Sequence, residues 1–91
     1  MHPYFVEFLG TLFLVCVIFI TGNWLAIGGA LALAIYLGHS ISIGAFNPAV
    51  TAAMYLKGKV SQTELMYYII AQMAGGVAAY YLYTFGLKKV L

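Results

Sequence analysis

Three long apolar stretches dominate the chain, and short polar segments separate them. The first predicts a helix over residues 4–22 and the second a helix over 25–42, with a turn-forming cluster at 21–23 between them. The third predicts a helix over 62–87, introduced by the capping-box spacing of 61–64. Because so short a turn joins the first two helices, we expect them to pack antiparallel.

A fourth segment, 44–57, is too short to cross a bilayer and too apolar for an aqueous loop. Asn47 is a favoured N-cap, and Pro48 suits the first helical position, where its missing N–H costs nothing. Gly58, which has a lysine on either side, is placed to end this short helix. Two arrangements fit the pattern: a helix lying on the membrane surface, or a re-entrant half-helix whose N-terminus reaches the bilayer midplane.

Composition decides which solvent surrounds these helices. Of the 91 residues, 65% are hydrophobic and only 7% are charged, which is far too little charge for the surface of a soluble domain. Apolar stretches of about 20 residues are long enough to cross a hydrocarbon core about 30 Å thick. The sequence therefore predicts a single all-α unit over 1–91 that is a multi-pass integral membrane protein, with three transmembrane helices and one re-entrant half-helix.

Charge and cysteine usage exclude several classes of function. The net charge of +2 offers no basic stripe for nucleic acid. Cys16 is the one cysteine, so no internal disulfide forms, and His2 and His39 lie a whole span apart, which leaves no cluster for a metal or cofactor. No second carboxylate lies near Glu7, so an enzyme is not expected. The N-terminus has no Lys/Arg n-region, and we expect no cleaved signal peptide.

Two polar side chains stand out inside the apolar spans. Glu7 lies in the first and Gln72 in the third, and each is costly in lipid unless it faces the interior of the bundle and finds hydrogen-bond partners. The backbone amides flanking Asn47 are candidate partners, since a re-entrant segment leaves backbone groups unpaired at membrane depth. The alternative for Glu7 is a position near the interface, in contact with water.

Small residues indicate where the helices approach one another. They recur every four residues, in the small-xxx-small manner that allows close backbone contact, at Gly28 and Ala32 in the second span and at Ala71, Gly75 and Ala79 in the third.

Four segments in register resemble the first half of the aquaporin and aquaglyceroporin (major intrinsic protein) family. They are Glu7–Thr11, Ala34–Leu37, Ile41–Thr51 with its Asn-Pro-Ala, and Ile70–Gln72 with Gly75. This resemblance implies a hemipore, one of two inverted three-helix repeats whose half-helices meet at the midplane. The activity it implies is passive transport of water or a small neutral solute such as glycerol across the lipid bilayer.

The resemblance also implies roles for individual residues. Asn47, Pro48 and Ala49 would form the constriction, with the Asn47 amide donating to passing oxygen atoms. The carbonyls of Gly44, Ala45 and Phe46 would accept hydrogen bonds from the solute, Ile27 and Val50 would stand at the selectivity filter, and Glu7 and Gln72 would brace the loop.

Three departures from the family pattern affect this expectation. Within these residues there is no second Asn-Pro-Ala, so one copy cannot enclose a pore; Val50 stands where the arginine follows the family's second motif; and Ile43 replaces a usual glycine. Because the two lysines at 57 and 59 and the two at 88 and 89 fall on opposite faces, charge does not fix the orientation. An antiparallel, dual-topology homodimer is therefore the favoured assembly. The alternatives are a separately encoded second half and a non-conducting membrane or assembly protein.

Overall fold

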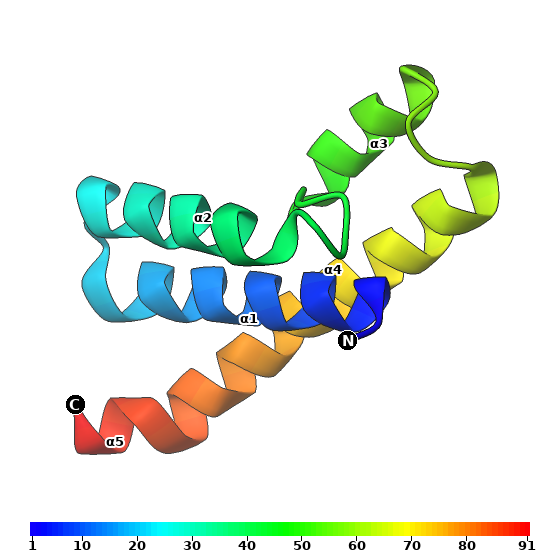
Figure 1. Ribbon diagram of the computed structural model, residues 1–91. Coiled ribbons are helices and arrows are strands. Elements are labelled where there is room, and N and C mark those ends of the chain that lie inside the picture. The colour runs from blue at the N-terminus through cyan, green and yellow to red at the C-terminus, as the bar shows by residue number, and fades with distance from the viewer.

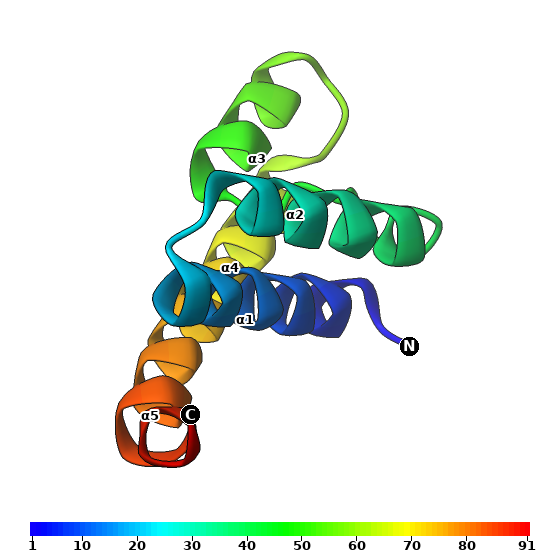
Figure 2. The ribbon, with the colours of Figure 1, turned by 90° about the vertical axis from the view of Figure 1, so that its left-hand side faces the viewer.

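The computed structural model describes residues 1–91, and all its regular structure is helical. The elements are α1 (Pro3–Thr21), α2 (Trp24–Gly38), α3 (Pro48–Leu56), α4 (Gln62–Leu82), the π-helical η1 (Tyr83–Leu87) and α5 (Lys88–Val90). The antiparallel pair α1 and α2 lies side by side, and α4 crosses α1 obliquely (Figure 1). The short α3 contacts α4, and in Figure 2 it lies above α2, on the side away from α1.

The helices differ in whether they could cross a membrane. By length and composition two qualify, α1 and the continuous helix Gln62–Val90, whereas the apolar α2 has 15 residues and α3 has 9. The prediction of an all-helical fold is confirmed.

Helix ends follow the local chemistry of the sequence. Gly22 ends α1 in the left-handed conformation (φ 53°), and Asn23 caps α2 by accepting from the amides of Leu25 and Ala26. The capping box before α4 is confirmed, because Ser61 accepts from the Glu64 amide while the Glu64 carboxylate accepts from the Ser61 amide.

Two predicted boundaries are wrong. The second helix ends at Gly38 and not at 42, because the next residues turn toward α1, where Ser42 and the amide of Gly44 find a polar partner. The last helix runs beyond 87, since η1 and α5 continue it as far as Val90. In η1 the Lys88 amide reaches back to the Tyr83 carbonyl, which is the wider spacing of a π-helix.

The small residues of α2 that were predicted to pack do not face α1. Gly28 and Ala32 are exposed within the chain, and nothing lies within 4 Å of a Cβ added at Gly28. The face that meets α1 carries Ala30, Ala34 and Gly38 instead, which repeat with the same spacing of four but are shifted by two residues. Spacing alone could not choose between two stripes of small residues on one apolar helix.

On α4 the small residues do mark the contact with α1. Gly75 and Ala79 are buried and Ala71 is half-buried. A Cβ added at Gly75 would lie 2.5 Å from the Phe8 carbonyl oxygen and 3.2 Å from the Leu12 amide nitrogen, so only glycine allows the two backbones to approach this closely.

Candidate functional site

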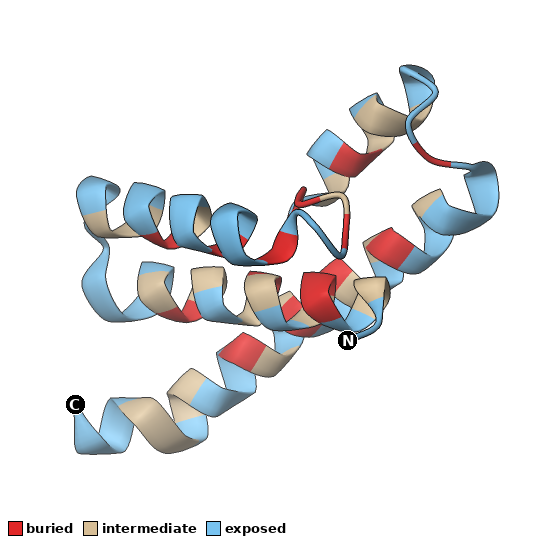
Figure 3. Ribbon diagram, viewed as in Figure 1, coloured by how far each residue is buried: buried red, intermediate tan, exposed pale blue.

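Residues 39–47 leave α2, turn back toward α1 and lead into α3. Two residues of this loop have a positive φ, Gly44 at 65° and Phe46 at 52°. Phe46 is the one non-glycine residue of the chain in this conformation, and residues with side chains rarely adopt it. The buried residues gather where the loop meets α1 and α4 (Figure 3).

The carboxylate of Glu7 lies at the centre of this cluster and is 0% exposed. Four groups donate to it: Ser42 Oγ at 2.6 Å, the Phe46 amide at 2.8 Å, Gln72 Nε2 at 2.8 Å and the Gly44 amide at 3.1 Å. Each carboxylate oxygen of Glu7 accepts two of these bonds, Oε1 from Phe46 and Gln72 and Oε2 from Ser42 and Gly44. The alternative in which Glu7 meets water at the interface is therefore wrong.

Gln72 carries this network from α1 to α3. Its Nε2 also donates to Thr51 Oγ1 at 2.7 Å, and Thr51 Oγ1 donates in turn to the Asn47 carbonyl at 2.9 Å. Thr51 is fully buried and Gln72 nearly so, although Gln72 Oε1 has no partner. One chain of hydrogen bonds thus runs from Glu7 to Asn47, the N-cap of α3.

Asn47 caps α3 as the sequence predicts. Its Oδ1 accepts from the Ala49 amide at 2.8 Å, and Pro48 occupies the start of the helix. The side chain is exposed, and its Nδ2 donates to no group of the chain. At the other end, Gly58 (φ 81°) and Lys59 donate to the carbonyls of Tyr55 and Met54, which is a Schellman C-cap.

The backbone carbonyls before Asn47 are free. Those of Gly44, Ala45 and Phe46 accept no hydrogen bond within the chain, whereas the amides of Gly44 and Phe46 are held by Glu7. The loop therefore has three carbonyls without a partner in the chain just before the free Nδ2 donor of Asn47, in residues that are themselves buried. Such a pairing of donor and acceptors suits a small neutral molecule that carries both kinds of group, such as water or an alcohol.

The chain does not bring the two filter candidates into this cluster. Val50 follows Asn47 on α3 and is 40% exposed. Ile27 is half-buried near the start of α2, at the opposite end of that helix from the loop, and α2 makes no substantial contact with α3.

Several residues of the cluster were not singled out from the sequence. Thr51 is a hydroxyl partner of the network, and its signal was its place four residues after Asn47, where a threonine can bond to the Asn47 carbonyl. Gly10 and Gly38, which face the Phe46 ring, gave a weaker signal: glycine is a poor helix former, yet both lie in helices.

Comparison with known proteins identifies the family. The model of the major intrinsic proteins matches residues 20–90. The chain belongs to the major intrinsic protein family. Together with the two helices that are long and apolar enough to cross a membrane, this membership makes it an integral membrane protein.

Curated relatives within the family carry two kinds of name. Glycerol uptake facilitator protein-like 6 of Lactiplantibacillus plantarum is 43% identical over 88 residues, covering 87% of this chain and 41% of that protein. Aquaporin Z of Photorhabdus laumondii is 41% identical over 58 residues (64% of this chain, 25% of the relative), and Aquaporin PIP1-1 of Arabidopsis thaliana is 40% identical over 52 (57% and 18%). The chain thus spans about two-fifths of the length of the first relative. No solved structure matches it.

Proposed function

We propose that this chain is a channel subunit that supplies one half of a pore for passive transport of water or a small neutral solute such as glycerol. The observation that carries the proposal is the loop before α3, where free carbonyls of 44–46 adjoin the free amide of Asn47. Family membership and the names of the relatives support the same activity.

In this proposal α1, α2 and α4 cross the bilayer and α3 is re-entrant, so that residues 1–91 form one aquaporin-like half repeat. The positive end of the α3 dipole then lies at the constriction formed by Asn47, Pro48 and Ala49, where it opposes cations. Glu7 and Gln72 brace the loop through the hydrogen bonds described above. The 15 residues of α2 span about 22 Å at 1.5 Å per residue, so we expect the bilayer to thin locally beside it.

The second half of the pore has to come from another three-helix unit, because the constriction has one wall in this chain. We favour a second copy in the opposite orientation, which would recreate an inverted repeat. Lys57 and Lys59 directly follow α3, and Lys88 and Lys89 belong to α5 at the other end of the molecule (Figure 1), so neither orientation is preferred by charge. In the dimer Ile27 and Val50 of each copy are the filter candidates.

The decisive test compares two asparagines that cap helices in the same way. Asn47→Asp keeps the capping oxygen and replaces the free Nδ2 donor by a negative charge, whereas Asn23→Asp makes the same change at the exposed cap of α2. In stopped-flow swelling of proteoliposomes we expect Asn47→Asp to lower solute flux at least tenfold and Asn23→Asp to leave it unchanged. Equal flux through the parent and Asn47→Asp would remove Asn47 from the mechanism.

The same vesicles distinguish water transport from glycerol transport, and tagged chains in cells distinguish the possible assemblies. A water channel raises osmotic permeability with glycerol uptake at background, and a glycerol channel raises both. C-terminal tags that label on both faces of the cell membrane are expected for the dual-topology dimer. Tags confined to one face, with no flux from the purified chain, would instead favour a separately supplied second half.

A further inference from the structure

We propose that Phe46 is a positioning residue of the channel: its ring, wedged between α1 and α2, holds the backbone that presents the carbonyls of 44–46 and the amide of Asn47. This role rests on the channel function proposed above and adds a second support for the loop, independent of the Glu7 network. It also assigns a purpose to the glycines at 10 and 38, which face the ring.

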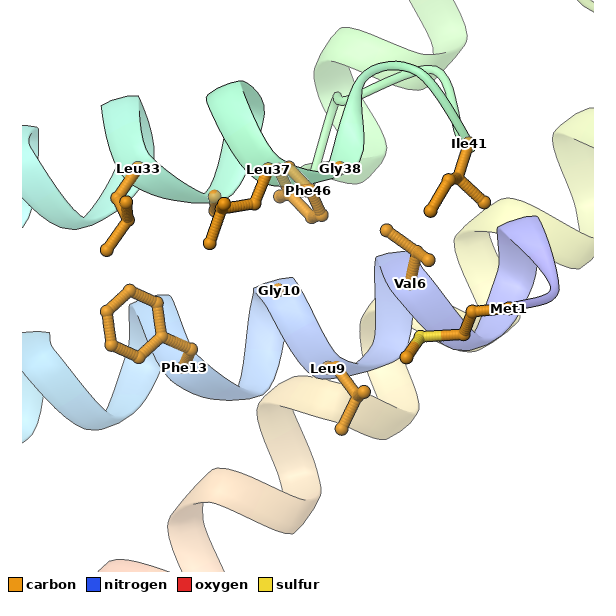
Figure 4. A pocket seen from close by; sticks show the side chains of 11 residues that line it. Met1, Val6, Leu9, Gly10, Phe13, Leu33, Leu37, Gly38, Ile41 and Phe46 are labelled. Atoms are coloured by element: carbon orange, nitrogen blue, oxygen red, sulfur yellow. The ribbon is translucent and has the colours of Figure 1, made fainter.

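The ring fills a notch made by two helical glycines. Phe46 is 3% exposed and forms the hydrophobic core with Val6 and Ala34. A Cβ added at Gly10 would lie within 2.8 Å of three ring atoms, and one added at Gly38 would lie 3.3 Å from the ring Cζ. Figure 4 shows Phe46 between Gly38 on α2 and Gly10 on α1. Both helices thus leave out a side chain where the ring is seated.

The backbone of Phe46 explains why such a seat is needed. A bulky residue at φ 52° persists only where its surroundings determine the conformation from more than one side. The Glu7 carboxylate holds the Phe46 amide at 2.8 Å on one side, and the notch holds the ring on the other. With both ends fixed, the peptide units on either side of Phe46 have little freedom to turn, and Asn47 follows directly.

An apolar groove lies beside the Phe46 ring. A groove of about 370 Å³ runs along α1 and α2, is lined almost wholly by apolar side chains, and includes Phe46 near its middle (Figure 4). Farther along it Phe13 and Leu33 point toward one another across the groove (Figure 4). An alanine in place of Phe46 would leave the notch open to this groove, and the loop would lose its apolar anchor.

Amide hydrogen exchange on the full chain in detergent micelles tests the positioning role directly. Phe46→Ala is compared with Leu31→Ala, which truncates a side chain packed against the same core cluster but outside the loop. We compare the exchange rate of the amides at positions 44 and 46 with that of the α1 amides. Phe46→Ala should raise this ratio at least tenfold, and Leu31→Ala should leave it unchanged. An equal rise of the ratio in both variants would mean that Phe46 is an ordinary core residue, and no rise in either would mean that it does not hold the loop. Either outcome would overturn the positioning role.

A second pair of variants covers the case in which Phe46→Ala does not fold. Gly10→Ala pushes the intact ring out of its notch and should speed the same two amides, whereas Phe46→Leu should retain most of their protection. Gly10→Ala without any change in loop exchange would overturn the wedge.

Flux measurements keep this inference separate from the channel function. In proteoliposomes the ratio of glycerol to water permeability should shift severalfold in Phe46→Ala and stay at the parent value in Leu31→Ala. If the parent chain conducts neither solute, the channel proposal fails, and the exchange data still decide whether Phe46 positions the loop.

Discussion

The loop before α3 is held on two sides by contacts of opposite character. On one side the buried Glu7 carboxylate accepts four hydrogen bonds, two of them from loop amides. On the other side the Phe46 ring is wedged between helices that carry glycine at the contact. The polar side fixes amide directions through short hydrogen bonds, and the apolar side fixes position through shape. Substitutions on the polar side and on the apolar side should therefore have different effects on stability and on the loop.

The largest expected effect comes from removing the polar support. Glu7→Ala removes the acceptor shared by four buried donors and leaves the Phe46 amide with no other partner. At about 1–3 kcal/mol for a buried unsatisfied group, added to the loss of the other three hydrogen bonds, we expect a loss of about 4 kcal/mol or no folded protein. Thermal unfolding in detergent, followed by circular dichroism, measures the loss. Glu64→Ala is the control, because that carboxylate is exposed and should cost only about 1 kcal/mol. Equal losses would mean that burial of Glu7 does not matter.

The polar contacts of the loop could be predicted from the sequence better than its apolar contacts, because polar residues are rare in so apolar a chain. Glu7 and Gln72 are the polar exceptions within spans, so their meeting with the loop could be expected from the cost of burying them in lipid. Asn47 and Pro48 likewise follow from capping rules. Gly10 and Gly38 are two of 10 glycines in the chain, and nothing local says which of them face a ring 36 and 8 residues away in the sequence.

The end of α2 and its packing face also depend on tertiary contacts that the sequence pattern does not reveal. The end of α2 at Gly38 was missed although His39, Ser40 and Ser42 follow it, because the turn is set by tertiary bonds to Glu7. The spacing of Gly28 and Ala32 drew attention to one stripe of small residues, and it does not reveal that a second stripe, with Ala30 and Ala34, meets α1. The sequence pattern predicts helix ends and contacts where polar and apolar residues alternate. Where every face of a helix is apolar, the packing face depends on the shapes of the side chains that meet.

The next largest effect should come from separating the helices that bring the polar side together. Gly75→Ala places a methyl group 2.5 Å from the Phe8 carbonyl oxygen, which forces α4 and its Gln72 away from Glu7. Overpacking of this kind costs about 2–3 kcal/mol, and Gly76→Ala is the matched control, since nothing lies within 4 Å of an added Cβ there. Unfolding in detergent should show a loss for the first variant and a small gain for the second. The same sign in both would contradict the close approach.

A smaller effect is expected when the apolar side is overfilled. Gly10→Ala gains helix propensity of about 1 kcal/mol but displaces the Phe46 ring, for a net loss of about 1–2 kcal/mol. Gly28→Ala makes the same substitution on an open face and should be stabilising by up to about 1 kcal/mol. In a Phe46→Ala background the penalty at Gly10 should disappear. A penalty that persists there would place its origin elsewhere than the ring.

The smallest effect sharpens the comparison by weakening the polar side at a single hydroxyl. Thr51→Val keeps the shape of the side chain but removes the donor to the Asn47 carbonyl and the acceptor for Gln72, which should cost about 1 kcal/mol. Thr51→Ser retains both bonds and serves as the control. Because Glu7 still holds the loop amides, we expect the exchange of Gly44 and Phe46 to change little, while the amide of Thr51 itself exchanges faster. If Thr51→Val instead loosened the amide of Phe46, the two sides of the loop would be coupled through α3, and their independence would have to be abandoned.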